Sequence, residues 1–223
     1  MPLPREEVLN GLQEQLTEFE ELVRSLDRQQ WNTPTRCEGW TVADIAAHWI
    51  GTLTEVVEGR TDQLGSPEVA ERIVQDRRGR SPQELADELA TTAEGARAIM
   101  GTLDDEAWDS PAPGGVAASI GVGVEALWYD AYVHTQDIRA ALGLPEQPGP
   151  GLKASVVHVA DMLSREGWGP ATLALDGMPE YPIGEGNGRR IEGDPLTFVL
   201  VATGRHDPSV LGLDETVNVY RPR

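Results

Sequence analysis

The chain has 223 residues, enough to bury a sizeable core in one large domain or in a bundle with a small appended unit. Its 37 acidic residues outnumber the 18 Lys and Arg, which gives a formal net charge of −19. Because such a surface repels nucleic-acid phosphates and anionic lipid headgroups, the composition disfavours a nucleic-acid or membrane partner.

Helical periodicity dominates the first two thirds of the sequence. Apolar residues recur three or four positions apart, the pattern of an amphipathic helix with one buried face. Ser81, Pro82 and Glu84 supply an N-cap, a first-turn proline and a capping-box acid, the clearest helix start in the chain. The charged segment 59–80 is expected to be a long connection with a short helical piece. The four long helices predicted in this way cover residues 5–27, 41–58, 81–100 and 121–142.

Four long helices favour a bundle, and the last third of the chain has a different pattern. Prolines and glycines gather at residues 146–151, which predicts a hinge. Beyond the hinge we expect a small unit with mixed elements, while residues 198–202 are ambiguous. The fold class is therefore predicted to be mainly α, with a four-helix bundle domain over residues 1–145 and a small α+β domain over residues 151–223. The elements expected in the second domain are a helix over 152–163, a strand over 171–175 and an edge strand over 215–220.

Two further features bear on compartment and on metal chemistry. The apolar runs are too short to span a bilayer, and Glu6 and Glu7 stand where a signal peptide would be basic and then apolar, so we expect a cytoplasmic protein. The single cysteine, Cys37, excludes an internal disulfide and a cysteine-rich metal site. Any bound metal ion must then use histidine and carboxylate ligands.

The fourth predicted helix carries two ionisable groups on its apolar face. His134 falls in the middle of the stripe, and Asp130 lies one turn earlier on nearly the same face. A buried imidazole and carboxylate are costly unless they pair with each other or bind a metal ion. The i, i+4 spacing suits both arrangements, so these two residues alone leave an ion pair and a metal site open.

His48 lies at the edge of the apolar stripe of the second predicted helix, from which it could reach the same interior point. Two histidines and a carboxylate would leave one coordination position open, as in catalytic zinc sites. Taken alone, His48 is better explained as a histidine on the flank of a helix. His158 and His206 fall outside the apolar stripes, and we expect both to be solvated.

The residues around these histidines resemble the mycothiol-dependent maleylpyruvate isomerase family, whose N-terminal half belongs to the DinB-like helical bundles. The first matching stretch, 31–48, contains Thr35-Arg-Cys-Glu-Gly-Trp-Thr41 and ends in Ala47-His48. Residues 130–143 match a second signature of the family. It consists of a carboxylate four residues before a histidine, followed by Asp, Arg and Ala-Leu-Gly. The C-terminal part is also similar, and the residues that carry these further matches are Asp44, Asp130, His134, Asp137, Arg139, Gly193-Asp194 and Gly204-Arg205.

The resemblance implies a DinB-like bundle that holds zinc, or another divalent metal, through two histidines and a glutamate. These ligands fall on His48, His134 and Asp130, and the shorter aspartate demands a closer helix or an intervening water. The resemblance also implies mycothiol, a low-molecular-weight thiol, as a cofactor of cis/trans isomerisation or as a nucleophile conjugated to a small electrophile. The metal would lower the pKa of the bound thiol. Arg205 could anchor a carboxylate of the thiol or of the substrate.

The predicted function is thus a zinc-dependent, mycothiol-using S-transferase or maleylpyruvate-type isomerase, acting as a monomer or homodimer on a small electrophile. Two alternatives stay open: a ligand-binding or regulatory bundle without turnover, and a hydrolase that uses zinc-bound water. Asp44 and Asp137 are placed to orient the histidines, or else face solvent. The cluster at 77–80, with three arginines, is expected to be a solvated connection or to attract an anionic ligand. Cys37 is expected to pack rather than to act as a nucleophile.

Overall fold

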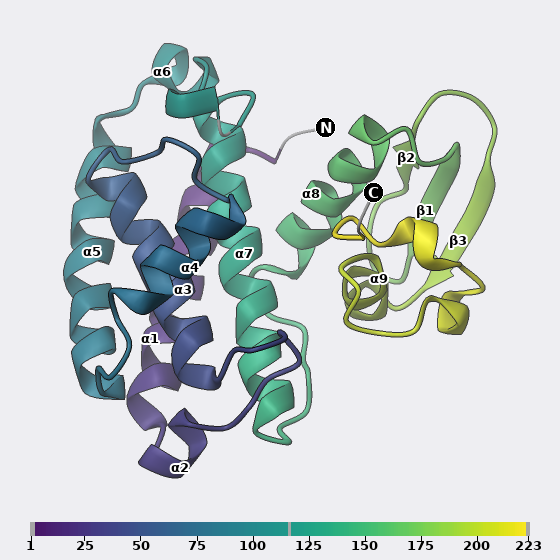
Figure 1. Cartoon of the computed structure of the whole chain (residues 1–223). Helices are drawn as coiled ribbons and strands as arrows, with labels where there is room; N and C mark the ends of the chain where they lie inside the picture. The colour runs from purple at the N-terminus through teal and green to yellow at the C-terminus, as the bar shows by residue number, and fades with distance from the viewer. Residues whose placement is uncertain (1–2, 116, 222–223) are drawn as a thin grey trace. The chain divides into compact units, whose positions relative to one another are not determined.

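The computed structural model describes residues 3–115 and 117–221, and the chain divides into two compact units (Figure 1). One unit is Pro4–Glu146, and the other contains Leu3 and residues 147–221. The predicted domains, 1–145 and 151–223, remain a prediction because a compact unit need not fold independently. No helix among the described residues is long and apolar enough to cross a membrane.

The first unit is a helical bundle, as the periodicity predicted. Helix α1 packs against α5 and α7, and α3 packs against α4, α5 and α7. The short helices and a 3₁₀ turn lie in the connections between the long helices (Figure 1). The elements of this unit are α1 (Arg5–Ser25), α2 (Arg28–Trp31), α3 (Val42–Val57), α4 (Pro67–Gln75), α5 (Pro82–Thr102), α6 (Asp105–Asp109), η1 (Pro113–Gly115) and α7 (Ile120–Ala141).

Local sequence sets where the central helices begin. Thr41 caps α3 by accepting from the backbone N–H of Asp44, whose side chain in turn accepts from Thr41 N at 2.9 Å. Ser81 and Glu84 form the same reciprocal arrangement at the start of α5. Because each capping box fixes the first turn, it also fixes which residues of the helix face the interior.

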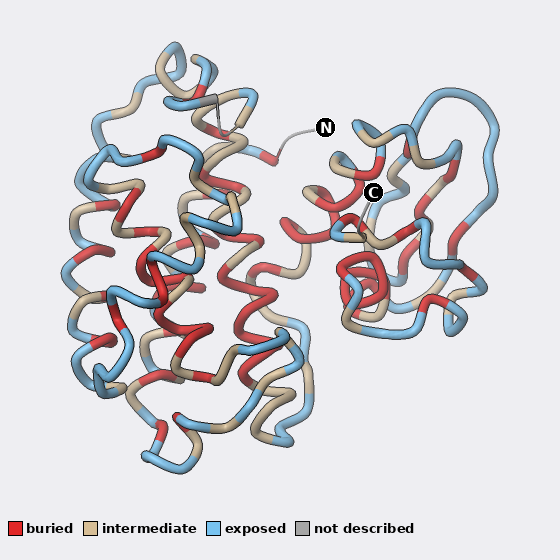
Figure 2. The backbone as a smooth tube through the Cα atoms, in the orientation of Figure 1, coloured by how far each residue is buried: buried red, intermediate tan, exposed pale blue. Residues whose placement is uncertain are grey.

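The core of the bundle lies between its long helices, and in Figure 2 buried positions recur along each of them. Phe19 and Trp49 are fully buried, with ring centroids 4.8 Å apart, and they join α1 to α3. Trp128 on α7 packs over Gly11 on α1, at a position where any side chain would overlap the indole. Close approach of these two helices therefore requires a glycine.

The connection between α3 and α5 is more ordered than its charge suggested. Arg77 is only 8% exposed, and its Nε and Nη2 donate to Glu88 Oε1 at 3.0 and 2.6 Å. Arg80 pairs with the other oxygen of Glu88, and Arg78 pairs with Asp44. The expectation of a solvated positive patch is therefore wrong for Arg77, since acidic partners on α5 and α3 neutralise the cluster.

The second unit contains two α-helices and a small sheet, which agrees with the predicted α+β class. Helix α8 packs against α9 and β2. The sheet has the order β2-β1-β3, in which β1 runs antiparallel to β2 and parallel to β3. The elements are α8 (Leu152–Arg165), β1 (Ala171–Leu175), β2 (Tyr181–Ile183), β3 (Arg189–Gly193), α9 (Pro195–Ala202), η2 (Pro208–Leu211) and η3 (Glu215–Val217).

Three sequence expectations in this unit need correction or completion. The predicted edge strand over 215–220 is wrong: Asp214 caps a 3₁₀ turn there by accepting from Thr216 N. The ambiguous segment 198–202 belongs to helix α9, which Asp194 caps and Pro195 begins. Strands β2 and β3 were not predicted, because each buries a single side chain and so lacks an alternating apolar pattern.

Candidate metal centre

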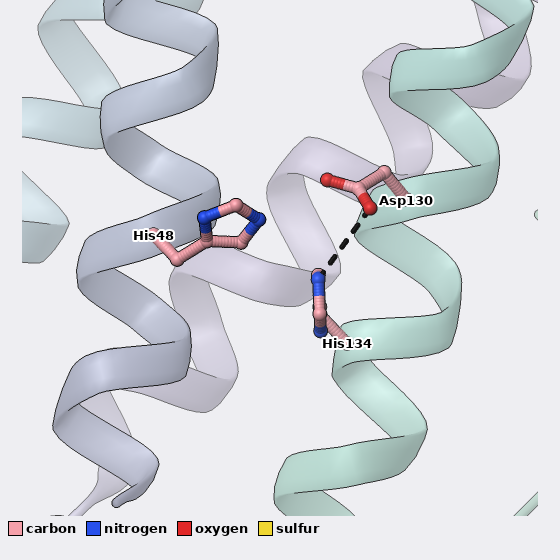
Figure 3. A group of neighbouring side chains, drawn as sticks. All are labelled: His48, Asp130 and His134. Carbon is pink, nitrogen blue, oxygen red and sulfur yellow. Dashed lines mark ion pairs between the residues drawn. The ribbon is translucent and has the colours of Figure 1, made fainter. Parts of the chain in front are cut away.

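Helices α3 and α7 bring His48, Asp130 and His134 together inside the bundle unit (Figure 3). One ligand atom from each side chain lies within 4.8 Å of the other two. His134 Nε2 is 3.4 Å from Asp130 Oδ1, and the two imidazole rings meet edge to face with centroids 5.2 Å apart. The three residues singled out from the sequence as metal ligands therefore converge on one point.

The positions of the three residues along their helices explain why their side chains converge. His48 lies almost two turns after the Thr41 cap, on the side of α3 that packs against α7. Asp130 and His134 are one turn apart, so their side chains project from the same face of α7. In Figure 3 the ring of His48 points across the gap between the helices toward the other two side chains.

Burial and neighbouring charges give the two histidines opposite protonation. Burial and the charge of His134 lower the pKa of His48 to about 4, although Asp130 acts in the other direction. Burial also opposes the charge of His134, but the carboxylates of Asp130 and Asp137 outweigh it and raise its pKa to about 9. Without a metal, the site at neutral pH thus contains a neutral imidazole and an imidazolium flanked by carboxylates.

The donor set fits a divalent metal ion. His48 is neutral and therefore keeps a nitrogen lone pair, and in Figure 3 one of its ring nitrogens faces Asp130 and His134. Asp130 is 26% exposed at its side chain, so its carboxylate is partly accessible to solvent. Two imidazole nitrogens and a carboxylate oxygen are common zinc ligands, with bonds of about 2.0–2.2 Å, so small side-chain rotations would close the site.

The two aspartates expected to orient the histidines differ in their contacts. Asp137 is fully buried, and its Oδ2 lies 3.0 Å from His134 Nδ1. Because a carboxylate can only accept, Nδ1 donates and Nε2 is the nitrogen left facing Asp130. Asp44 instead caps α3 and pairs with Arg78 at 3.1 Å, so it fixes the helix rather than the ring of His48.

Two residues near the cluster were given no role at the metal site from the sequence. Trp40 packs beside His48, with ring centroids 4.9 Å apart, and Arg36 donates from Nε to Asp137 Oδ1 at 2.7 Å. Both lie in the stretch that resembles the family signature, which was the available signal. Periodicity could not identify them because they belong to a loop.

The other candidate residues do not belong to this cluster of three. Arg205 belongs to the second unit, where its Nη1 donates to Thr203 O at 3.3 Å, and its role in anchoring a ligand remains a prediction. His206 is exposed and His158 is half-buried, both in the same unit. Cys37 is half-buried, with its Sγ 3.7 Å from Asp137 Oδ2.

Fold and site together define a class: helical bundles with a two-histidine, one-carboxylate cluster between facing helices. The sequence profile of the mycothiol maleylpyruvate isomerase N-terminal domain matches residues 12–139. That match covers more than half of the chain, so the chain belongs to this family.

Solved structures carry the same fold over nearly the whole length. The crystal structure of the mycothiol-dependent maleylpyruvate isomerase matches with a TM-score of 0.67, and that of its histidine-to-alanine mutant with 0.66. In both cases the sequence identity is 18%, and 96% of each chain is covered. Among curated proteins no match was found.

Proposed function

We propose that this protein is a metal-dependent enzyme that uses mycothiol to isomerise or to conjugate a small electrophilic substrate. Zinc or another divalent ion would be held by His48, Asp130 and His134. The observation that carries the proposal is the convergence of three ligand atoms within 4.8 Å at the positions that match the family signature. Maleylpyruvate, named in the family and in both matching structures, is the first substrate to test.

The residues of the cluster would have different roles in binding the metal ion and in orienting its ligands. His48 offers a lone pair without first losing a proton, since its pKa is about 4. Asp130 supplies negative charge, and Asp137 holds the proton on His134 Nδ1 so that Nε2 turns toward Asp130. When bound, a divalent ion would lower the pKa of a coordinated thiol and make thiolate available near neutral pH.

A second candidate, a binding bundle without a metal, has one observation in its favour. The 3.4 Å separation of His134 Nε2 and Asp130 Oδ1, together with the raised pKa of His134, also suits a buried ion pair that needs no ion. The two candidates make different demands on His48, because a metal ion would engage the ring nitrogen that faces Asp130 and His134 in Figure 3, whereas an ion pair between those two residues needs nothing from His48.

The test is a thiol-dependent assay on zinc-loaded protein. Maleylpyruvate is offered with mycothiol, with glutathione, and without thiol, and the same series is run with His134→Ala. Isomerisation that requires mycothiol and is lost in the variant supports the proposal. Cleavage of the substrate without thiol would indicate zinc-water hydrolysis instead, and absence of turnover and of metal in the wild type would favour the binding bundle.

A further inference from the structure

The loop 35–41 between α2 and α3 carries much of the first signature stretch but supplies none of the three candidate ligands. Its own hydrogen bonds fix its shape: Thr35 N donates to Trp40 O at 2.9 Å, and Trp40 N donates to Cys37 O at 3.0 Å. An antiparallel bridge between Pro34 and Thr41 closes its base. A loop held in this way can present side chains to α7 in a fixed position.

Arg36 in this loop connects three parts of the bundle unit. Its Nε donates to Asp137 Oδ1 at 2.7 Å, and its Nη1 donates to Glu146 Oε1 at 2.8 Å. The side chain of Arg36 is only 25% exposed, and that of Asp137 is fully buried. Because two anchors define the plane of the guanidinium, Arg36 fixes the direction in which the Asp137 carboxylate faces.

The second oxygen of Asp137 faces the metal cluster. Oδ2 accepts from His134 Nδ1 at 3.0 Å, so the chain of contacts runs from Arg36 through one carboxylate to a candidate metal ligand. Cys37 Sγ also approaches Oδ2, but at 3.7 Å a thiol is a weak donor. Loss of Arg36 would remove a charged partner of the Asp137 carboxylate and so weaken the constraint on the orientation of the His134 ring.

We propose that Arg36 is a positioning residue for the metal centre, which acts through Asp137 to set the ring orientation and tautomer of His134. This inference rests on the proposed function, because it assigns a role relative to the metal ligands. It also relates the loop 35–41 to both histidines of the cluster: Trp40 packs on His48, and Arg36 orients His134 through Asp137.

The experiment measures zinc affinity of the full chain by competition with a chromophoric chelator, and the visible spectrum of the Co²⁺-loaded protein. Four variants accompany the wild type: Arg36→Ala, Arg36→Lys, His134→Ala and Arg28→Ala. Arg28 is the matched control, since it lies on neighbouring α2, is exposed, and forms no ion pair among the described residues. Thermal unfolding of each metal-free variant monitors the fold.

We expect Arg36→Ala to bind zinc about 10-fold more weakly than the wild type, within the range found for lost partners of metal-ligating histidines. Arg36→Lys should recover part of this loss, and Arg28→Ala should stay within about twofold. The Co²⁺ bands of Arg36→Ala should shift even at saturation. A purely structural role for Arg36 would lower thermal stability without moving these bands.

Two results would overturn the inference, and they differ in what they say of the proposed function. If His134→Ala abolishes binding but Arg36→Ala keeps wild-type affinity and spectrum, only the role of Arg36 fails. If the wild type itself binds neither zinc nor Co²⁺, the metal centre and the role of Arg36 fail together.

Discussion

Asp130 is the residue on which the chemistry of the candidate centre depends most. We predict that Asp130→Asn weakens zinc binding at least about tenfold, because it removes the only anionic ligand of the set. Asp130→Glu should bind at least as tightly as the wild type, since the longer side chain keeps the charge and extends the reach toward His48. Competition titrations measure both. An Asn variant with unchanged affinity would remove Asp130 from the ligand set.

From the raised pKa of His134 we predict how the folding stability of the metal-free protein depends on pH. A histidine whose folded pKa of about 9 exceeds its unfolded value of 6.5 stabilises the fold fully below pH 6.5 and loses that contribution as the pH rises through 9. The loss should be on the order of 3 kcal/mol, since each pKa unit corresponds to about 1.4 kcal/mol.

Urea unfolding between pH 6 and 10, with EDTA present, checks this expectation. His134→Gln should lack the alkaline slope that the wild type shows, and the difference between the two proteins gives the contribution of His134. Equal slopes in both proteins would mean that the flanking carboxylates do not hold the proton.

At the scale of elements, the contact of α1 with α7 depends on one glycine. A Cβ at Gly11 would overlap the ring of Trp128, which is only 3% exposed. Gly11→Ala should therefore destabilise the protein by about 1–3 kcal/mol, despite the better helix propensity of alanine.

Gly101 on α5 provides the matched control, because a Cβ there meets nothing within 4 Å. Gly101→Ala should be neutral or stabilise by up to about 1 kcal/mol. Chemical denaturation of both variants measures the two effects. A Gly11→Ala protein as stable as Gly101→Ala would contradict the close packing of α1 on α7.

Elements were predictable where their signals are local. The start of α5 follows from Ser81 and Glu84, and the facing of His134 follows from its spacing within α7. Arg36 was not predictable, because its partner Asp137 lies 101 residues away and no periodicity links them. The burial of Arg77 and the strand β3 were missed for the same reason, because the ion pair of Arg77 and the pairing of β3 with β1 are tertiary contacts.

For the whole molecule, the exposed connection 143–148, which overlaps the hinge predicted at 146–151, should be the site of first cleavage. Residues 143–148 are mostly exposed and lie between α7 and α8, outside regular structure. Limited proteolysis with subtilisin should therefore give two fragments that meet in this segment, identified by mass spectrometry. First cleavage inside a helix of either unit would argue against a boundary there.

The central claim is that His48, Asp130 and His134 bind one divalent metal ion, and metal content tests it most directly. The protein is purified without a chelator or a histidine tag, and the wild type and His134→Ala are compared by inductively coupled plasma mass spectrometry. We predict about one zinc, or another divalent ion, per wild-type chain and little in the variant. A wild type that contains no metal, even after incubation with zinc, would contradict the account and favour a buried ion pair in a metal-free bundle.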